Sequence, residues 1–308
     1  MPRAIALAAA LFVSSPLAAQ AQIERLPAEI GARIAAMGPR FDADVLRETG
    51  ALFAALPAPS TDGLRVSENQ SYGPDPRHRL SVYSPAQEGS SRPILVFVHG
   101  GGFVRGDIAP NVAAYAARNG LVGIAMTYRL APQNPWPAGA QDVGRAIAWI
   151  RENAARLGGD PARIILFGHS AGATHAAGYA LDPALHPAGG PGIAGLILGS
   201  GFLKMTEADK APNNLAYFGT DPATYATRSP MTHLAQSRLP VLLFNAQYDP
   251  AFLGAPTLEM ATGICWRDGH CPRVVTLRGH NHVSELYAVG TADDELGQEI
   301  LRFVRETR

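Results

Sequence analysis

The chain has 308 residues, of which 47% are hydrophobic and 17% are charged, with a formal net charge of zero. This length can hold one large core or two domains. A balanced charge gives no electrostatic basis for binding nucleic acid or an anionic membrane surface. We therefore expect no nucleic-acid partner.

The first 21 residues have the pattern of an export signal. Arg3 gives a positive start, residues 4–13 form a short apolar core, and residues 19–21 (Ala-Gln-Ala) form a small-x-small cleavage site. Neither this core nor any later apolar segment is long enough to span a bilayer. An uncleaved anchor or an amphipathic first helix is the alternative. We expect cleavage after Ala21, a secreted or periplasmic protein, and no stable membrane insertion.

The mature chain, residues 22–308, is predicted to form a single α/β domain. An Ala-rich helical segment, interrupted at Gly38-Pro39, opens it within residues 22–62. Two strands, 63–69 and 80–83, then flank a turn rich in proline and glycine.

From residue 94 onward, apolar runs alternate with helical patterns. The predicted strands are 94–98, 122–126, 163–167, 193–198, 241–246 and 274–277. The predicted helices are 112–118, 138–157, 171–181, 256–265 and 296–304. This alternation predicts a mostly parallel central sheet with helices on both faces, interrupted by an irregular excursion at residues 201–234.

One motif in this pattern points to chemistry. The apolar strand 163–167 leads into G-x-S-x-G at residues 168–172, and small residues follow. In a strand–turn–helix context the two glycines allow a tight elbow that presents the Ser170 hydroxyl at the sheet edge. A turn with an incidental serine is the alternative. We expect Ser170 to be a nucleophile.

A serine nucleophile needs a base and an acid from later strands. Strand 274–277 leads into a loop with two histidines, of which we favour His282 as base, with His280 as the fallback. Asp249 follows strand 241–246 and is the expected acid, although it could instead cap a helix. Serine, then aspartate, then histidine is a chain order in which a fold with such a serine elbow arranges its catalytic groups.

The expected oxyanion hole is formed by backbone amides. Strand 94–98 runs directly into His99-Gly100-Gly101-Gly102, whose glycines leave N–H groups free to face a developing negative charge. We expect Gly101, Gly102 and Ala171 to supply the donors, with His99 as a structural partner. No phosphate-binding pattern follows this loop.

The two cysteines, Cys265 and Cys271, bracket a five-residue loop. In an oxidising compartment we favour a disulfide between them over free thiols. A metal site with His270 lacks a fourth ligand and a typical spacing. No metal and no organic cofactor is expected.

These motifs resemble the α/β-hydrolase superfamily, and within it the HGGG-containing esterases related to hormone-sensitive lipase. The resemblance runs from about residue 80 to the C-terminus. It rests on HGGG at 99–102, YRLAP at 128–132, WPA at 136–138, Asp142-Val143, GGDP at 158–161 and GHSAG at 168–172. The lipase group usually has aspartate before the serine, so His169 is more similar to the bacterial feruloyl-esterase-like and arylformamidase-like branches.

The expected activity is hydrolysis of a small carboxylic ester, short-chain or aromatic, through an acyl-serine intermediate. Helices within 22–62 and the excursion 201–234 are expected to form a small cap. The candidate substrate-binding side chains are Phe103, Trp136, Phe202, Phe218, Tyr248 and Phe252.

Alternatives to this activity remain at this level. They are an aryl formamidase with the same triad, a hydroxycinnamate esterase, and a non-catalytic binding protein with the same fold. The oligomeric state is not set by the sequence, and a homodimer is one option.

Overall fold

The computed structural model describes residues 26–56, 60–87 and 89–307, and the predicted export signal lies outside these ranges. Within them eight strands form one sheet in the order β1-β2-β4-β3-β5-β6-β7-β8. Only the pairs β1–β2 and β2–β4 are antiparallel, so the prediction of a mostly parallel sheet is confirmed. The strands are β1 Leu64–Ser71, β2 Arg79–Pro85, β3 Arg92–Val98, β4 Val122–Met126, β5 Gly159–His169, β6 Gly195–Gly199, β7 Val241–Tyr248 and β8 Arg273–Asn281.

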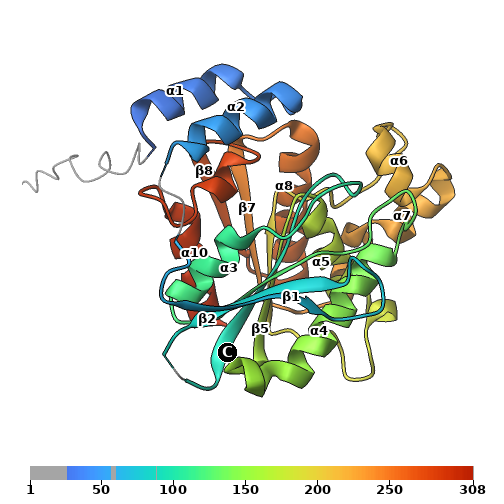
Figure 1. Ribbon diagram of the computed structural model, residues 1–308. Helices are drawn as coiled ribbons and strands as arrows, with labels where there is room; N and C mark the ends of the chain where they lie inside the picture. Colours follow the sequence, from blue (N-terminus) through green and yellow to red (C-terminus); the bar gives the residue numbers. More distant parts are fainter. Residues whose placement is uncertain (1–25, 57–59, 88, 308) are drawn as a thin grey trace, which may run out of the picture.

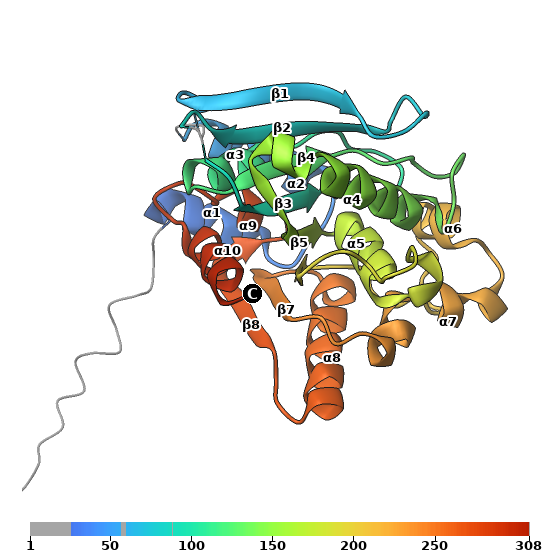
Figure 2. The same ribbon diagram turned by 90° about the horizontal axis from the view of Figure 1, so that it is seen from below.

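Helices cover both faces of this sheet, as Figures 1 and 2 show. One face carries α3 (Pro110–Arg118) and α10 (Glu295–Glu306). The other carries α4 (Ala138–Leu157), α5 (Ala171–Leu181) and α8 (Ala251–Asp268). All the predicted helices are present, but α8 begins five residues before the predicted start at Pro256, directly after Pro250.

The sheet is buried on both faces by alternating side chains. In β3, Ile94, Val96 and Val98 belong to the core beneath α4, α5 and α8, whereas Leu95 and Phe97 belong to the core beneath α3 and α10. This period of two explains why the strand appears in the sequence as an unbroken apolar run. A rigid, doubly covered sheet results, and its carboxyl edge carries the loops of interest.

Two segments lie over that edge. The N-terminal helices α1 (Ala28–Met37) and α2 (Ala43–Ala54) pack on β8 and on the short helix α9 (Ser284–Tyr287). The excursion after β6 is irregular, as expected, and holds only short helices. These are α6 Pro212–Phe218, α7 Tyr225–Arg228 and the 3₁₀ turns η3 Pro222–Thr224 and η4 Pro230–Gln236. In Figure 1, α1 and α2 lie above β7 and β8, and α6 lies to one side.

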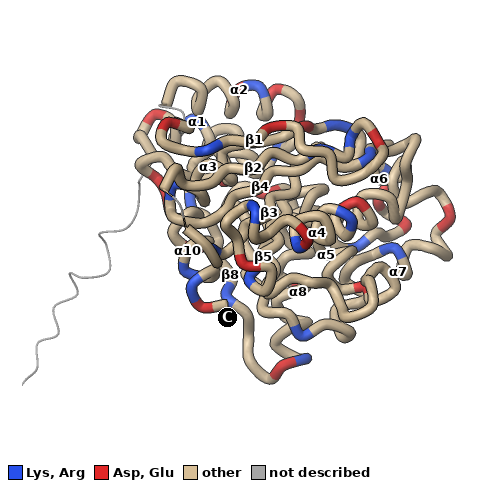
Figure 3. The backbone as a smooth tube through the Cα atoms, turned by 60° about the horizontal axis from the view of Figure 1, so that its bottom comes forward, with Lys and Arg blue, Asp and Glu red and all other residues tan. Residues whose placement is uncertain are grey.

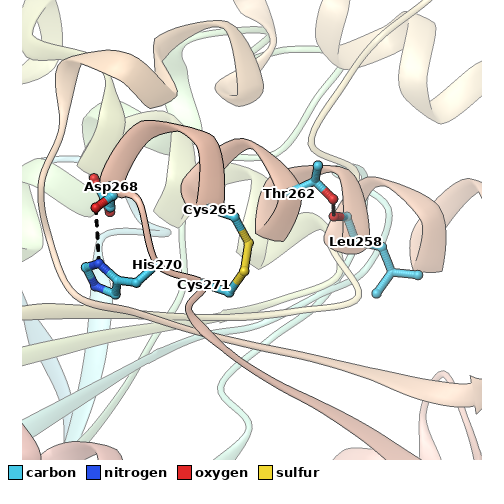
Figure 4. Close-up of a disulfide and its surroundings, with 6 residues drawn as sticks. All are labelled: Leu258, Thr262, Cys265, Asp268, His270 and Cys271. Carbon is cyan, nitrogen blue, oxygen red and sulfur yellow. Dashed lines mark hydrogen bonds between the residues drawn. A yellow bond between two sulfur atoms is a disulfide. The ribbon is translucent and has the colours of Figure 1, made fainter.

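Away from that edge, Cys265 at the end of α8 and Cys271 before β8 form a disulfide (Figure 4). Basic and acidic residues are interspersed along the described chain (Figure 3), in keeping with the zero net charge. Among the helices of residues 26–307 that the structure describes, none has the length and apolar character needed to cross a membrane.

Candidate active site

Ser170 occupies a strained elbow between β5 and α5. Its φ of 56° lies in the left-handed region, which is uncommon for a residue with a side chain. The turn is possible because its flanking residues are glycines: a Cβ on Gly168 would lie 2.3 Å from the Gly172 carbonyl oxygen, and one on Gly172 would lie 2.1 Å from that of Val98. The Ser170 N–H donates to the Gly199 carbonyl at 2.9 Å, which ties the elbow to the neighbouring strand.

The predicted base and acid are hydrogen-bonded to each other. His282 follows β8 and Asp249 follows β7, and His282 Nδ1–H donates to Asp249 Oδ1 at 3.0 Å. Asp249 Oδ2 also accepts from the Ala246 N–H at 2.8 Å and from the Ser200 hydroxyl at 2.6 Å. Three donors favour an ionised carboxylate, and that carboxylate fixes the His282 tautomer with Nε2 unprotonated.

His282 Nε2 is buried and has no hydrogen-bond partner among the described residues. It lies on the same pocket as Ser170. In enzymes without bound substrate, hydrogen bonds between catalytic groups are often long and shorten only when substrate binds. The imidazole is therefore oriented by Asp249 and has its other nitrogen available as a proton acceptor.

The other candidate, His280, points into a different hydrogen-bond network. Its Nε2 contacts Asp293 Oδ2 at 3.0 Å and its Nδ1 contacts Ser284 Oγ at 3.1 Å. Both ring nitrogens are thus used within the loop after β8. This arrangement braces the loop, and of the two histidines His282 is the one hydrogen-bonded to Asp249.

The glycine loop after β3 lies directly against the elbow. A Cβ on Gly100 would come within 3.0 Å of the Ser170 Cβ. Gly101 and Gly102 have φ of 123° and 58°, and within the described residues neither of their N–H groups donates to a protein acceptor. Ala171 opens α5, where N–H groups have no intrahelical acceptor and the helix dipole is positive. All three residues line the pocket that holds Ser170.

His99 shapes this loop without facing the pocket. Its Nδ1–H donates to the Gly100 carbonyl at 2.6 Å, and the Tyr128 hydroxyl donates to the His99 carbonyl at 2.9 Å. The Gly100 carbonyl and the Gly101 N–H belong to the same trans peptide and point in opposite directions. The hydrogen bond from His99 to the Gly100 carbonyl therefore turns the Gly101 N–H away from His99. Burial lowers the pKa of His99 to about 4, so the ring stays neutral.

A second anchor holds the turn that follows β4. Buried Asp142 on α4 accepts from the Arg129 side chain and backbone N–H and contacts His78 Nε2 at 3.0 Å. This cluster braces the turn that follows β4, and none of its three residues lines the pocket.

The pocket above Ser170 has a volume of about 440 Å³. Three of the six aromatic residues proposed from sequence, Phe103, Phe202 and Phe252, line it. The other three are not among the residues that line it. Phe218 is fully buried behind Phe103, Trp136 packs on the same aromatic cluster outside the pocket, and Tyr248 packs beneath the N-terminal helices.

Other pocket residues were not among the predicted site residues, and four of them come from the two candidate cap segments. Phe41 and Leu46 come from the N-terminal segment, and Asn213 and Asn214 come from the excursion after β6. Phe41 packs edge-on against His282, with ring centroids 4.8 Å apart. Both candidate cap segments thus contribute walls to the pocket. Phe41 carries no sequence signal of its own, since it lies in the short turn between two helices.

His169, the residue before Ser170, lines the pocket and also contacts a buried acid on α9. Its Nε2 lies 2.7 Å from Glu285 Oε1, and its ring stacks at a tilt 4.7 Å from that of His282. His169, His282 and Glu285 place possible ligand atoms within 4.8 Å of one another. Glu285 Oε1 already contacts both His169 and Ser200, so the structure favours a hydrogen-bond network here over a metal centre.

The chain is similar to known proteins of one fold family. The model of the alpha/beta hydrolase fold family matches residues 95–253. Carboxylesterase NlhH of Mycobacterium tuberculosis is 42% identical over 96 residues, covering 30% of each chain. Esterase LipQ of the same organism is 34% identical over 176 residues, covering 51% of this chain and 42% of LipQ. The matches therefore span less than half the length of these relatives.

Solved structures match over nearly the whole chain. Esterase B from Lactobacillus rhamnosis superposes with a TM-score of 0.71 at 19% identity, covering 90% of this chain and 96% of that one. A bacterial heroin esterase superposes with a TM-score of 0.68 at 24% identity, covering 91% and 98%. At these identities the likeness concerns the fold. With more than half of its residues matched by the family model, the chain belongs to the α/β-hydrolase fold family.

Proposed function

We propose that the protein is a serine carboxylic-ester hydrolase. Ser170 is its nucleophile, His282 its base, and Asp249 the acidic residue whose carboxylate orients His282. The observation that carries this proposal is the Asp249–His282 hydrogen bond of 3.0 Å beside a pocket that also holds Ser170 and the glycine loop. The carboxylesterase and esterase relatives support the same reaction class.

In the first half-reaction the Ser170 Oγ attacks the ester carbonyl carbon while its proton passes to His282 Nε2. The carbonyl oxygen becomes an oxyanion, which the N–H groups of Gly101, Gly102 and Ala171 stabilise. Asp249 stabilises the imidazolium that forms. The tetrahedral intermediate then collapses, the alkoxide leaves with the proton from His282, and Ser170 remains acylated.

Water completes the cycle. His282 Nε2 removes a proton from the water, whose oxygen attacks the acyl carbon. The same amides hold the second oxyanion. Collapse returns the proton to the Ser170 Oγ and releases the carboxylic acid. Every step uses groups of this chain, and the donors are fixed before the substrate binds.

The walls of the pocket support a short-chain or aromatic acyl group. Phe103 and Phe202 form one wall, and Phe41 and Phe252 form the rim, with ring centroids 6.3 Å apart. A pocket of about 440 Å³ shared between acyl and alcohol groups leaves little room for a long chain. The preferred substrates are therefore small esters with an apolar acyl group.

The protein is also proposed to be exported. The charge, apolar core and small-residue site of residues 1–21 support this. The disulfide between Cys265 and Cys271 is in keeping with an oxidising compartment. N-terminal sequencing of protein recovered from the periplasm or medium should begin at Gln22, and a chain that retains residues 1–21 contradicts the cleavage.

The function is tested on purified wild-type protein and the Ser170→Ala variant. A fluorophosphonate should add one phosphonyl group to Ser170 in the wild type and none to the variant, as read by peptide mass spectrometry. Acetyl, butyryl, octanoyl and feruloyl esters then define the acyl preference, and an N-formyl aromatic amide tests the formamidase alternative. Absence of both label and turnover in the folded wild type rejects the hydrolase proposal.

A further inference from the structure

A second buried acid lies behind the Asp249–His282 pair. Glu285 on α9 is fully buried, and so is Ser200 at the end of β6. The Ser200 hydroxyl lies 2.6 Å from Asp249 Oδ2 and 2.8 Å from Glu285 Oε1, so one hydroxyl bridges the two carboxyl groups. The mechanism above leaves Glu285, Ser200 and His169 without a role.

The number of protons in this bridge determines which of the two carboxyl groups is protonated. The Ser200 hydroxyl has a single proton for two carboxyl oxygens, so one of the two acids must supply a second. Asp249 already accepts from the Ala246 N–H and His282 Nδ1–H, which favours its ionised form. Glu285 Oε2 has no hydrogen-bond partner among the described residues, which is costly for a buried carboxylate. The extra proton therefore belongs on Glu285 Oε1.

The surroundings of Glu285 agree with this assignment. The titratable groups beside it are His169 from β5, Asp249 from β7 and His282 after β8. Burial raises the pKa of Glu285 well above its usual value, and the Asp249 charge adds to this. Burial also lowers the pKa of His169 well below its usual value, with His282 as a further cause. The His169–Glu285 contact of 2.7 Å is then a hydrogen bond between two neutral groups.

We propose that Glu285 is a positioning residue of the triad, a neutral carboxylic acid that donates to Ser200 while accepting from His169. This proposal rests on the ester-hydrolase function proposed above. With its lone pair occupied by Glu285, Ser200 must turn its own proton to Asp249, which keeps that carboxylate ionised and oriented. The His169–Glu285 contact also keeps His169 neutral. The ring of His169 lies 4.7 Å from that of His282, so a positive charge on His169 would oppose formation of the His282 imidazolium.

Two substitutions of Glu285 test whether it acts as a neutral hydrogen-bond donor or as a negative charge. In Glu285→Gln the side-chain amide has two N–H groups. One can donate to Ser200, and the other can donate to His169 Nε2 if His169 takes the tautomer in which Nε2 is unprotonated. The kcat should therefore stay within about threefold of wild type. In Glu285→Leu the relay is lost, so kcat should fall by about tenfold to a hundredfold while KM changes little. Equal loss in both variants would mean that a charged Glu285 is required and would overturn the proposal.

Asp293→Asn is the matched control, because Asp293 forms the other buried histidine–carboxyl pair of this segment, with His280 at 3.0 Å. It should lower the melting temperature without lowering kcat. A kcat loss in Asp293→Asn as large as that in Glu285→Leu would indicate a merely structural effect. In the Ser200→Ala background, Glu285→Leu should cost little further kcat, and additive losses would contradict the relay.

A measurement independent of turnover distinguishes this proposal from the hydrolase proposal. The infrared difference between wild type and Glu285→Gln at neutral pH should contain the C=O stretch of a protonated carboxyl group. A carboxylate band in its place overturns the assignment, even if Glu285→Leu does not fold. If fluorophosphonate fails to label the wild type, the hydrolase proposal fails while the infrared result still decides the state of Glu285.

Discussion

Phe41 packs edge-on against His282 with ring centroids 4.8 Å apart, so the N-terminal helical segment touches the proposed base. Phe41 is 38% exposed and lies on the rim of the pocket beside Phe252. This contact explains why the segment before the sheet matters to the site: it covers the imidazole and narrows the pocket mouth.

Phe41→Ala should therefore change acyl selectivity. Loss of apolar contact should reduce kcat/KM for a butyryl ester by about tenfold, and the wider mouth should raise the octanoyl-to-butyryl ratio. Initial rates on a matched series of p-nitrophenyl esters measure this. Leu258→Ala, an exposed apolar residue of α8 outside the pocket, is the control and should leave the ratio unchanged.

The two histidines after β8 should respond in opposite ways. His282→Ala should reduce kcat by about a thousandfold or more, because no other described group is hydrogen-bonded to Asp249 as a base. His280→Ala should keep most of the turnover but lower the free energy of unfolding by about 1–3 kcal/mol, because it leaves the buried Asp293 carboxyl unpartnered. Steady-state kinetics and urea unfolding measure the two effects, and the reverse pattern would transfer the base to His280.

The sequence predicted those parts of the site that follow an apolar strand directly. Ser170, Asp249, His282 and the glycine loop each come right after such a run, and parallel strands bring their carboxyl ends to one edge. Ser200 lies at the carboxyl end of β6, where no sequence motif marks it as part of the site. Glu285 and Phe41 belong to a four-residue helix and an interhelical turn, where periodicity carries no signal. Their roles arise from packing between distant segments.

The aromatic residues illustrate the same limit. Phe103 and Phe218 are both buried, and their ring centroids lie 5.6 Å apart. Of the two, only Phe103 lines the pocket. Composition and position along the chain cannot tell which of two touching rings faces the cavity. That depends on the left-handed backbone of Phe103, whose φ is 72°, and on how the excursion after β6 folds over it.

Gly172 should be intolerant of any side chain, whereas Gly178 on the same helix should accept one. A Cβ on Gly172 would lie 2.1 Å from the Val98 carbonyl, a backbone atom that cannot move aside, so Gly172→Ala should cost about 3 kcal/mol or more of stability. The nearest atom to a Cβ on Gly178 is 3.5 Å away, so Gly178→Ala should be neutral or stabilise the helix by up to about 1 kcal/mol. Thermal unfolding of both variants tests this, and equal losses would contradict the close packing of the elbow.

Buried neutral imidazoles should make the fold sensitive to acid. Burial lowers the pKa of His99 to about 4 and that of His175 to about 3, from 6.5 in an unfolded chain. Below pH 6.5 the unfolded state binds protons that the folded state does not, so stability present at neutral pH is lost as the pH falls, by about 1.4 kcal/mol per pH unit for each imidazole. Glu285 acts in the opposite sense, since its raised pKa favours the folded state as the pH falls toward 4.5. Urea unfolding at pH values from about 7.5 to about 4.5 measures the net slope of the unfolding free energy against pH. Within this range the groups named above bind protons differently in the folded and unfolded states.

His175→Gln isolates one of these imidazoles, because glutamine can still contact the Tyr217 hydroxyl, which lies 3.1 Å from His175 Nδ1, but cannot bind a proton in this range. The pH slope of the unfolding free energy should therefore fall by about one proton relative to wild type. His270→Gln, at an exposed position in the loop closed by the disulfide, should leave the slope unchanged. An unaltered slope in His175→Gln would mean that His175 binds its proton equally well in the folded and unfolded states, contrary to its burial beside Tyr128 and Tyr217.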